Sequence, residues 1–398
     1  MYQQPSPPKL TPKQKAISEA EWPKFTDGEM KRRRRAMETL LASENISHLL
    51  LYGAGGRGSA VPWLTGWPVT TEVISIVSPK ERDSLFIQYF NHTPFAERLI
   101  DEAGVSWGGE STIHSAIQEL ERRGGKNTKI GVIGALPFEP YEVLKAFAGK
   151  IVNLNAAYTK LRLVKSEEEL EWFRIGAALS DLAIDALLAE MRTGLTEHDL
   201  AEIVESSYVP WGGKTGIHFF GVTAMKNPHL YVPAQFTSNR VVNAGDIVFT
   251  EITASFWEHA GQVLRSFSVE AEPTSLFRDL HLAAEAAFDE ICAATKPGNF
   301  PEDLVEAGKV IEKSGFTICD DLVHGYGGGY FPPILGLPSR RQEPTPDFVL
   351  EKGMMMVVQP NVVTTDKIAG VQTGECIVVT EGGGVSLHQA PRGFLRIN

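Results

Sequence analysis

The stretch VHGYGGGYFPP, residues 323–333, combines a histidine with three consecutive glycines and invites two incompatible interpretations. A glycine-rich loop can cradle a phosphate with its backbone N–H groups. The same stretch could be the remnant of a metal site from which the ligand has been lost. No helix-start pattern follows the glycines, so the sequence disfavours the phosphate loop.

A second glycine-rich stretch, GAGGRGS at residues 53–59, follows an apolar run. We interpret it as a simple loop whose Arg57 could grip an anionic group. The three cysteines, Cys292, Cys319 and Cys376, have neither paired nor metal-type spacing, which favours reduced thiols.

Composition narrows the class of partner. The chain has 398 residues, 43% of them hydrophobic, and a formal net charge of -11. That charge argues against nucleic acid or an anionic membrane as partner and leaves a small-molecule substrate. The polar, proline-rich N-terminus does not resemble a signal peptide and no apolar run is long enough to span a membrane, so we expect a cytoplasmic protein.

Two domains are expected for this length, after an N-terminal arm at residues 1–24. In residues 25–158, helical patterns alternate with short apolar runs, which predicts a small α/β domain. The predicted strands are HLLLY at 48–52, VISIV at 73–77, SLFIQ at 84–88 and KIGVIG at 129–134.

The second domain, residues 159–398, opens with a long predicted helix. Ser166 followed by Glu169 forms a capping box at its start. Further helices then alternate with hairpin-like runs such as VNAGDIVFTEITASF and GQVLRSFSVEAEP. This order predicts an α+β domain on a curved antiparallel sheet.

The order of segments in the second domain resembles the pita-bread (M24-like) family of methionine aminopeptidase, aminopeptidase P, prolidase and creatinase. The matching segments are LVKSEEELEWFR, MKNPHLYVP, NAGDIVFTEITASFWEHAGQVLRSF, HGYGGG, KGMMMVVQPNVV and QTGECIVVTEGG. The first domain is similar to the N-terminal domain of creatinase, prolidase and aminopeptidase P. The resemblance implies the pita-bread fold and a homodimer.

The resemblance also implies where two metal ions would be held in the peptidases, by two aspartates, a histidine and two glutamates. Those positions fall on Glu251, Gln262, Gly328, Gln359 and Glu375. Two carboxylates, two neutral amides and a glycine cannot balance two divalent ions. We therefore predict no metal and no other cofactor, although His229, Glu251, His324 and Glu375 could form a mononuclear site.

Creatinase works without a metal, and the resemblance implies similar roles here. His229 matches the histidine that shuttles protons, a role suited to an imidazole. Glu375 and Glu251 would hold charge or activate water, and His324 would be a second acid or base. A buried, hydrogen-bonded structural role is the alternative for each of these side chains.

We therefore expect a metal-independent, creatinase-like hydrolase that cleaves a C–N bond in a small polar, amino-acid-like substrate. Two alternatives stay open: a lyase on the same fold, and a non-catalytic binding module. The expected substrate-binding residues lie either in the segments that match the family site or in the glycine-rich loop at residues 53–59 of the first domain. They are Gln262, Gln359, Gly328, Arg57, Tyr326, Tyr330 and Phe331.

Overall fold

The structure is a computed structural model, and it describes residues 5–327, 329–340 and 344–398. The chain divides into two compact units. Residues 20–162 form the N-terminal unit, and residues 163–398 form the C-terminal unit together with residues 1–19. The beginning of the chain therefore groups with the C-terminal unit, where Gln14 Nε2 donates to Glu171 Oε2 at 2.8 Å.

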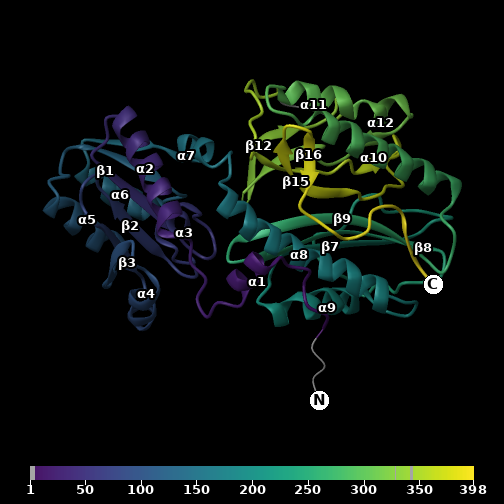
Figure 1. The fold of residues 1–398 in the computed structure, drawn as a ribbon, viewed down its shortest axis with the longest axis horizontal. Coiled ribbons are helices and arrows are strands. Elements are labelled where there is room, and N and C mark those ends of the chain that lie inside the picture. Colours follow the sequence, from purple (N-terminus) through teal and green to yellow (C-terminus); the bar gives the residue numbers. More distant parts are fainter. Residues whose placement is uncertain (1–4, 328, 341–343) are drawn as a thin grey trace, which may run out of the picture. The chain divides into compact units, whose positions relative to one another are not determined.

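The N-terminal unit is a mixed sheet of six strands in the order β4-β3-β2-β1-β5-β6, with helices around it (Figure 1). Neighbouring strands β1 and β2 are antiparallel, whereas β1 and β5 are parallel. The predicted α/β domain is confirmed, but sequence reasoning missed the edge strands β4 and β6. The strands are β1 (His48–Gly53), β2 (Val73–Val77), β3 (Asp83–Ile87), β4 (Ala103–Trp107), β5 (Lys129–Ile133) and β6 (Lys150–Asn153). The helices are α2 (Asp27–Ser43), α3 (Ala60–Thr65), η1 (Phe90–His92), α4 (Thr93–Leu99), α5 (Thr112–Arg122), α6 (Phe138–Phe147) and α7 (Asn155–Leu161).

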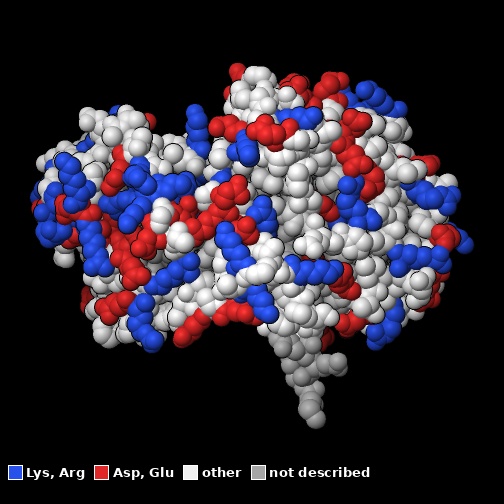
Figure 2. Space-filling model, in the orientation of Figure 1, with Lys and Arg blue, Asp and Glu red and all other residues white. Residues whose placement is uncertain are grey.

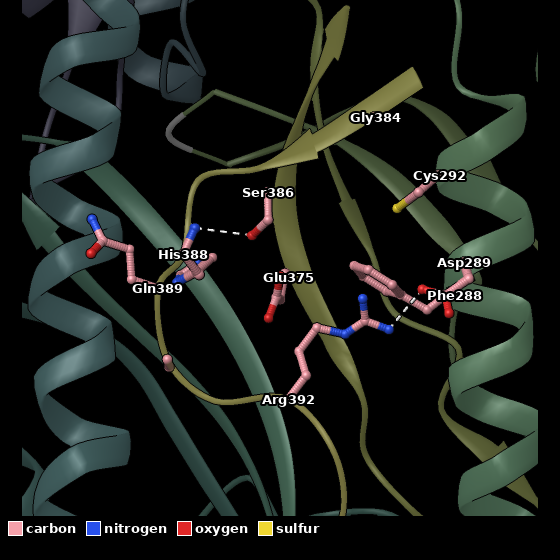
Figure 3. A pocket seen from close by; sticks show the side chains of 10 residues that line it. Phe288, Asp289, Cys292, Glu375, Gly384, Ser386, His388, Gln389 and Arg392 are labelled. Carbon is pink, nitrogen blue, oxygen red and sulfur yellow. Dashed lines mark hydrogen bonds and ion pairs between the residues drawn. The ribbon is translucent and has the colours of Figure 1, made fainter. Parts of the chain in front are cut away.

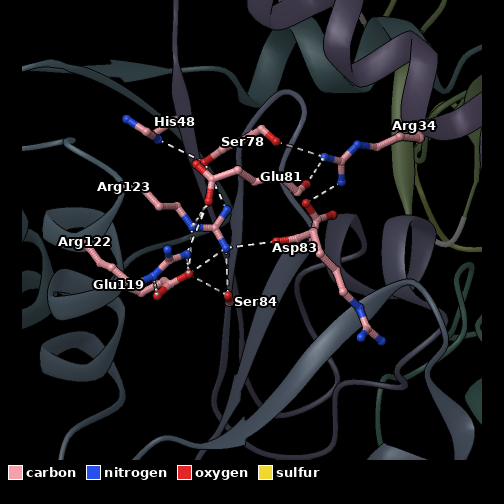
Figure 4. Close-up of polar contacts among 10 residues, drawn as sticks. Arg34, His48, Ser78, Glu81, Asp83, Ser84, Glu119, Arg122 and Arg123 are labelled. Atoms are coloured by element: carbon pink, nitrogen blue, oxygen red, sulfur yellow. Dashed lines mark hydrogen bonds and ion pairs between the residues drawn. The ribbon is translucent and has the colours of Figure 1, made fainter.

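The basic run KRRRR in α2 is tied into ion pairs. Arg33 is buried and its guanidinium lies 2.6 Å from the Glu29 carboxylate. Arg34 pairs with the buried Asp83, beside a second cluster in which Arg123 contacts Glu119 at 2.7 Å (Figure 4). On the face drawn in Figure 2, Lys and Arg side chains lie among Asp and Glu side chains. The run therefore stabilises the N-terminal unit internally.

The C-terminal unit is built on one strongly bent sheet with the order β12-β11-β13-β15-β9-β8-β7. In Figure 1, α8 and α9 lie beside β7, β8 and β9, whereas α10, α11 and α12 lie beside the remaining strands. The predicted pita-bread fold on a curved antiparallel sheet is confirmed. The helices are α1 (Pro12–Ser18), α8 (Glu167–Glu190), α9 (Glu197–Tyr208), η2 (Val209–Trp211), α10 (Ser275–Ala294), α11 (Pro301–Gly308) and α12 (Val310–Lys313). The strands are β7 (Lys214–Ala224), β8 (Asp246–Phe256), β9 (His259–Val269), β10 (Thr317–Ile318), β11 (Val323–Tyr326), β12 (Tyr330–Leu335), β13 (Met355–Val358), β14 (Val362–Val363), β15 (Gly374–Thr380), β16 (Gly383–Ser386) and β17 (Leu395–Ile397).

Helix α8 fixes the β8–β9 hairpin on which the candidate site is built. It begins with the predicted capping box, in which the Glu169 backbone N–H donates to Ser166 Oγ at 3.1 Å. Its approach to the hairpin is very close, since a Cβ at Gly261 would lie 2.3 Å from Ala177 Cα. The Ala254 backbone N–H donates to Ser180 Oγ at 2.8 Å, which ties the helix to the hairpin. The hairpin is therefore a rigid platform.

None of the helices that the structure describes is both long and apolar enough to cross a membrane.

Candidate active site

The β8–β9 hairpin places a carboxyl group and an amide side by side. Strand register pairs Glu251 with Leu264 and Thr253 with Gln262, so alternation puts Glu251 and Gln262 on one face of the sheet. Both are nearly inaccessible, at 7% and 2% exposure. Gln262 Nε2 donates to Glu251 Oε1 at 2.7 Å.

Two further side chains extend this contact. Gln262 Nε2 also donates to Gln359 Oε1 at 3.2 Å, and Gln359 itself is fully buried just after β13. Gln359 Nε2 in turn donates to Asp320 Oδ2 at 3.4 Å. Two amides thus link two carboxyl groups in the order Asp320, Gln359, Gln262 and Glu251, which we call the amide bridge.

Sequence reasoning missed Asp320. It stands in CDDLVH, four residues before His324, and the turn between β10 and β11 brings it to Gln359. The available signal was a pair of adjacent aspartates, Asp320 and Asp321, directly before an apolar strand that enters the site. Asp320 supplies a carboxylate that does not stand at any of the five metal-ligand positions of the family.

Glu251 holds its proton to unusually high pH. Burial raises the pKa of its carboxyl group to about 8, and the nearby Asp320 charge acts in the same direction. A carboxyl group with such a pKa is largely neutral at pH 7 and can donate a proton to a reacting atom. The two ends of the amide bridge are therefore suited to different tasks, Glu251 to that of an acid and Asp320 to that of a base.

His324 lies against the same cluster as a neutral imidazole. It is fully buried, its Nδ1 lies 3.1 Å from the Gly325 carbonyl oxygen, and burial lowers its pKa to about 4. Tyr330 covers it, with stacked rings whose centroids are 3.9 Å apart. Tyr330 is 53% exposed and so lies between His324 and solvent, whereas Tyr326 is buried with its ring centroid 5.8 Å from that of His324.

The structure separates Glu375 from the amide bridge, which contradicts its predicted place in the cluster. In the β15–β9 register, Glu375 faces Val263, and Val263 points to the opposite side of the sheet from Gln262. Glu375 is buried there in an ion pair with Arg265. Gly374, the residue before Glu375 on β15, does share the face of the amide bridge, and a Cβ added there would lie 3.0 Å from Gln359 Cβ. A carboxylate on β15 would have to stand at position 374, one residue before Glu375, to reach the amide bridge.

Glu375 instead lines a cavity of about 510 Å³ beside α10 (Figure 3). His388 and Arg392 line the same cavity. Asp181 Oδ1 lies 2.8 Å from His388 Nδ1, and that carboxylate raises the pKa of His388 to about 10 against the opposing effect of burial. These charges are paired within the fold, which favours a structural role for Glu375.

The other predicted residues are less closely connected. His229 is exposed and its Nδ1 lies 3.0 Å from Thr223 Oγ1; among the described residues, no hydrogen bond or ion pair joins it to the amide bridge. Arg57 is exposed in the N-terminal unit, and Gly328 lies outside the described residues. Phe331 is buried.

The glycines of VHGYGGGYFPP do not simply leave space. An added Cβ at Gly327 would lie 2.6 Å from the Phe331 ring, and one at Gly325 would lie 2.3 Å from the Pro332 carbonyl oxygen. Both glycines are needed for close packing of the β11–β12 hairpin. The chain is therefore tightly packed at Gly325 and Gly327.

The fold family implies two metal ions, and the described residues do not fit them. At the family positions the sheet face presents one carboxyl group, Glu251, and two amides, Gln262 and Gln359, which are bonded to each other. A neutral amide brings no negative charge to offset that of a divalent ion, and the polar atoms of Gln262 and Gln359 are already hydrogen-bonded within the amide bridge. In the described part of the chain, no group of three or more His, Cys, Asp or Glu side chains is arranged to hold a metal ion.

Comparison with known proteins gives consistent matches to one family. The sequence model of Metallopeptidase family M24 matches residues 171–381. An Xaa-Pro dipeptidase of Pyrococcus furiosus is 24% identical over 68% of this chain and 76% of its own length. An uncharacterized hydrolase/peptidase of Sinorhizobium fredii is 24% identical over 92% of this chain and 96% of its own.

Solved structures match over nearly the whole chain. An Xaa-Pro dipeptidase from Bacillus anthracis has a TM-score of 0.79 at 18% identity, covering 92% of this chain and 100% of that protein. An X-Pro aminopeptidase from Thermotoga maritima has the same TM-score and identity, with 92% and 99% coverage. At this level of identity the structural matches establish the fold alone.

Proposed function

The chain belongs to metallopeptidase family M24, and on that premise we propose that it is a metal-independent hydrolase of a C–N bond in a small polar, amino-acid-like substrate. The observation that carries the proposal is the amide bridge, with Glu251 and Asp320 at its ends. Hydrolysis of a C–N bond needs an acid that protonates the leaving nitrogen and a base that takes a proton from the attacking water. The bridge offers one candidate for each task.

Glu251 is the proposed acid. Its pKa of about 8 keeps the proton in place at neutral pH and makes transfer to a departing amine favourable. Gln262 orients the carboxyl group by donating to one of its oxygens. The proton would pass to the leaving nitrogen as the C–N bond breaks, which leaves Glu251 as a carboxylate. The proton that Asp320 takes from the attacking water would then return to Glu251 through solvent, which restores both groups for the next cycle.

Asp320 is the proposed base. It accepts a long hydrogen bond from Gln359 and lies near Glu251, whose pKa it raises. Two neighbouring carboxyl groups of which one is protonated can divide acid and base roles between them. Asp320 would take a proton from water as the oxygen attacks the carbonyl carbon. His324, neutral and capped by Tyr330, would offer a nitrogen to the substrate without adding charge.

His229 remains a second proposed proton carrier on the strength of the family resemblance. It is exposed and tethered to Thr223, so it would have to meet the substrate from its own loop. Mutation distinguishes Glu251 from His229 as the proton donor. If Glu251 is the acid, Glu251→Gln removes turnover, whereas His229→Ala lowers turnover less.

The substrate class is also a proposal. Two of the relatives named above are Xaa-Pro dipeptidases, which supports an amide of an amino acid as substrate. The two buried amides also suit a neutral carbonyl better than a strongly charged group. We propose assays of Xaa-Pro dipeptides, cyclic amides and N-substituted amino acids with chelator-treated protein. Turnover lost in Glu251→Gln and kept in the exposed control Glu381→Gln is the expected result.

Labelled water then identifies the reaction. Incorporation of one labelled oxygen into the acid product is expected for a hydrolase. A product without label would identify a lyase instead. Turnover that requires added Mn²⁺ or Zn²⁺ would refute the metal-independent mechanism, and binding of every ligand without turnover would point to a binding module.

A further inference from the structure

The N-terminal unit exposes an unusual group of aromatic rings where β3 and β4 end. Tyr89 and Phe90 follow β3 and are 50% and 68% exposed, and Trp107 closes β4 at 46% exposure. The two strands are parallel, so both chain segments leave the sheet at the same edge. Large aromatic side chains normally bury most of their surface, so three together in solvent need an explanation.

Two of these rings form a fixed corner. The rings of Phe90 and Trp107 meet edge to face, with centroids 5.7 Å apart and planes at 80°. The Trp107 Nε1–H donates to the Gln88 backbone carbonyl oxygen at 3.1 Å, which holds the indole in one orientation. The corner therefore presents ring faces to solvent without having to reorganise.

The rings line a cavity of about 750 Å³ whose charged groups are acidic. Its lining includes three glutamates, Glu72, Glu110 and Glu139, and one histidine, His114, but no lysine and no arginine. Glu72 is positioned by the Tyr52 hydroxyl, which donates to its Oε2 at 3.1 Å. The first turn of α5 also borders the cavity, and its partial positive charge of about half a unit is outweighed by three carboxylates.

Aromatic faces and carboxylates share one preference among ligands. The face of an aromatic ring is negative and attracts a cation placed over it, most strongly for tryptophan. Carboxylates attract the same charge at longer range, and the lining holds no lysine or arginine that would compete for the rings. We propose that this cavity binds a small organic monocation, such as a quaternary ammonium or a guanidinium, between the Phe90–Trp107 corner and the three glutamates.

This site is separate from the amide bridge, since it belongs to the N-terminal unit and rests on different residues. The carboxylate oxygens of Glu72, Glu110 and Glu139 would accept hydrogen bonds from a guanidinium. The aromatic rings would contact the methyl groups of a quaternary ammonium. The backbone N–H groups at the start of α5 offer a partner for a hydroxyl oxygen on the same ligand.

The test compares each cation with an uncharged molecule of the same shape. Choline is titrated into the full-length protein by calorimetry against 3,3-dimethylbutan-1-ol, and methylguanidinium against N-methylurea as its neutral counterpart. We expect at least one cation to bind about tenfold more tightly than its neutral counterpart, the size of one good cation–π contact. Equal affinities in both pairs, or no binding of either cation, would overturn the proposal.

Two matched tryptophan variants locate the site. Trp107→Leu keeps apolar bulk but removes the indole face, and we expect it to weaken cation binding about tenfold. Trp22→Leu changes another half-exposed tryptophan of the same unit that does not line the cavity, and it should leave binding unchanged. Glu110→Gln should weaken cation binding and make it less sensitive to salt. Equal losses in the two tryptophan variants would contradict the assigned position.

Discussion

Replacing Glu251 by glutamine should stabilise the protein increasingly as the pH rises. In the unfolded chain this carboxyl group loses its proton near the ordinary value of 4.5, whereas in the folded protein it keeps the proton to about pH 8. Its folded pKa is raised, so the unfolded state binds fewer protons between these values and stability falls as pH rises through that window. Below about pH 4.5 both states are protonated and the loss disappears.

The size of the effect follows from the same values. Each pH unit inside the window costs about 1.4 kcal/mol, so the wild type should lose about 3 kcal/mol relative to Glu251→Gln between pH 5 and pH 7.5. Glutamine mimics the protonated acid and keeps an oxygen that can accept from Gln262 Nε2. Side chains that do not interact with residue 251 contribute equally in both proteins and cancel in the difference.

The assay is urea unfolding at several pH values, for wild type, Glu251→Gln and the exposed control Glu381→Gln. Urea is uncharged and leaves the titration undisturbed. We expect the stability gap to grow with pH for Glu251→Gln alone. A gap that is constant from pH 5 to 7.5, or one that also grows for Glu381→Gln, would refute the assignment of a retained proton to Glu251.

Two further predictions concern groups whose burial sets their properties. Arg34→Leu leaves the buried Asp83 carboxylate without its partner and should cost about 3 kcal/mol of unfolding free energy. The control Arg35→Leu, on the exposed side of α2, should cost less than about 0.5 kcal/mol. Equal losses of stability in denaturant unfolding would contradict the pairing of Arg34 with Asp83. Tyr330→Ser uncovers His324, so the pKa of that imidazole should rise from about 4 towards its ordinary 6.5, and an NMR titration that finds it unchanged would show that Tyr330 does not exclude water there.

Sequence reasoning found the elements of the fold where local pattern decides them. The capping box of Ser166 and Glu169 and the apolar runs of β1, β2 and β5 depend on neighbouring residues only. It also found Glu251, Gln262 and Gln359, which meet because strand register brings them to one face.

Sequence reasoning failed where the place of a side chain depends on a one-residue shift of strand register or on a turn that brings distant residues together. Glu375 and Gly374 point to opposite faces of β15, so a shift of one position removes the side chain from the site. Asp320 reaches Gln359 only through the turn before β11, a contact across 39 residues that no local pattern encodes. The homodimer and the cytoplasmic location stay predictions.

The metal content of the purified protein tests the central claim most directly. Cells are grown with added Mn²⁺, Co²⁺ and Zn²⁺, and elemental analysis compares wild type with the double variant Gln262→Asp, Gln359→Glu. We predict no stoichiometric metal in the wild type, because two amides occupy the positions of anionic ligands, and a gain of metal in the double variant. Stoichiometric metal in the wild type that is lost in Glu251→Gln would contradict the account.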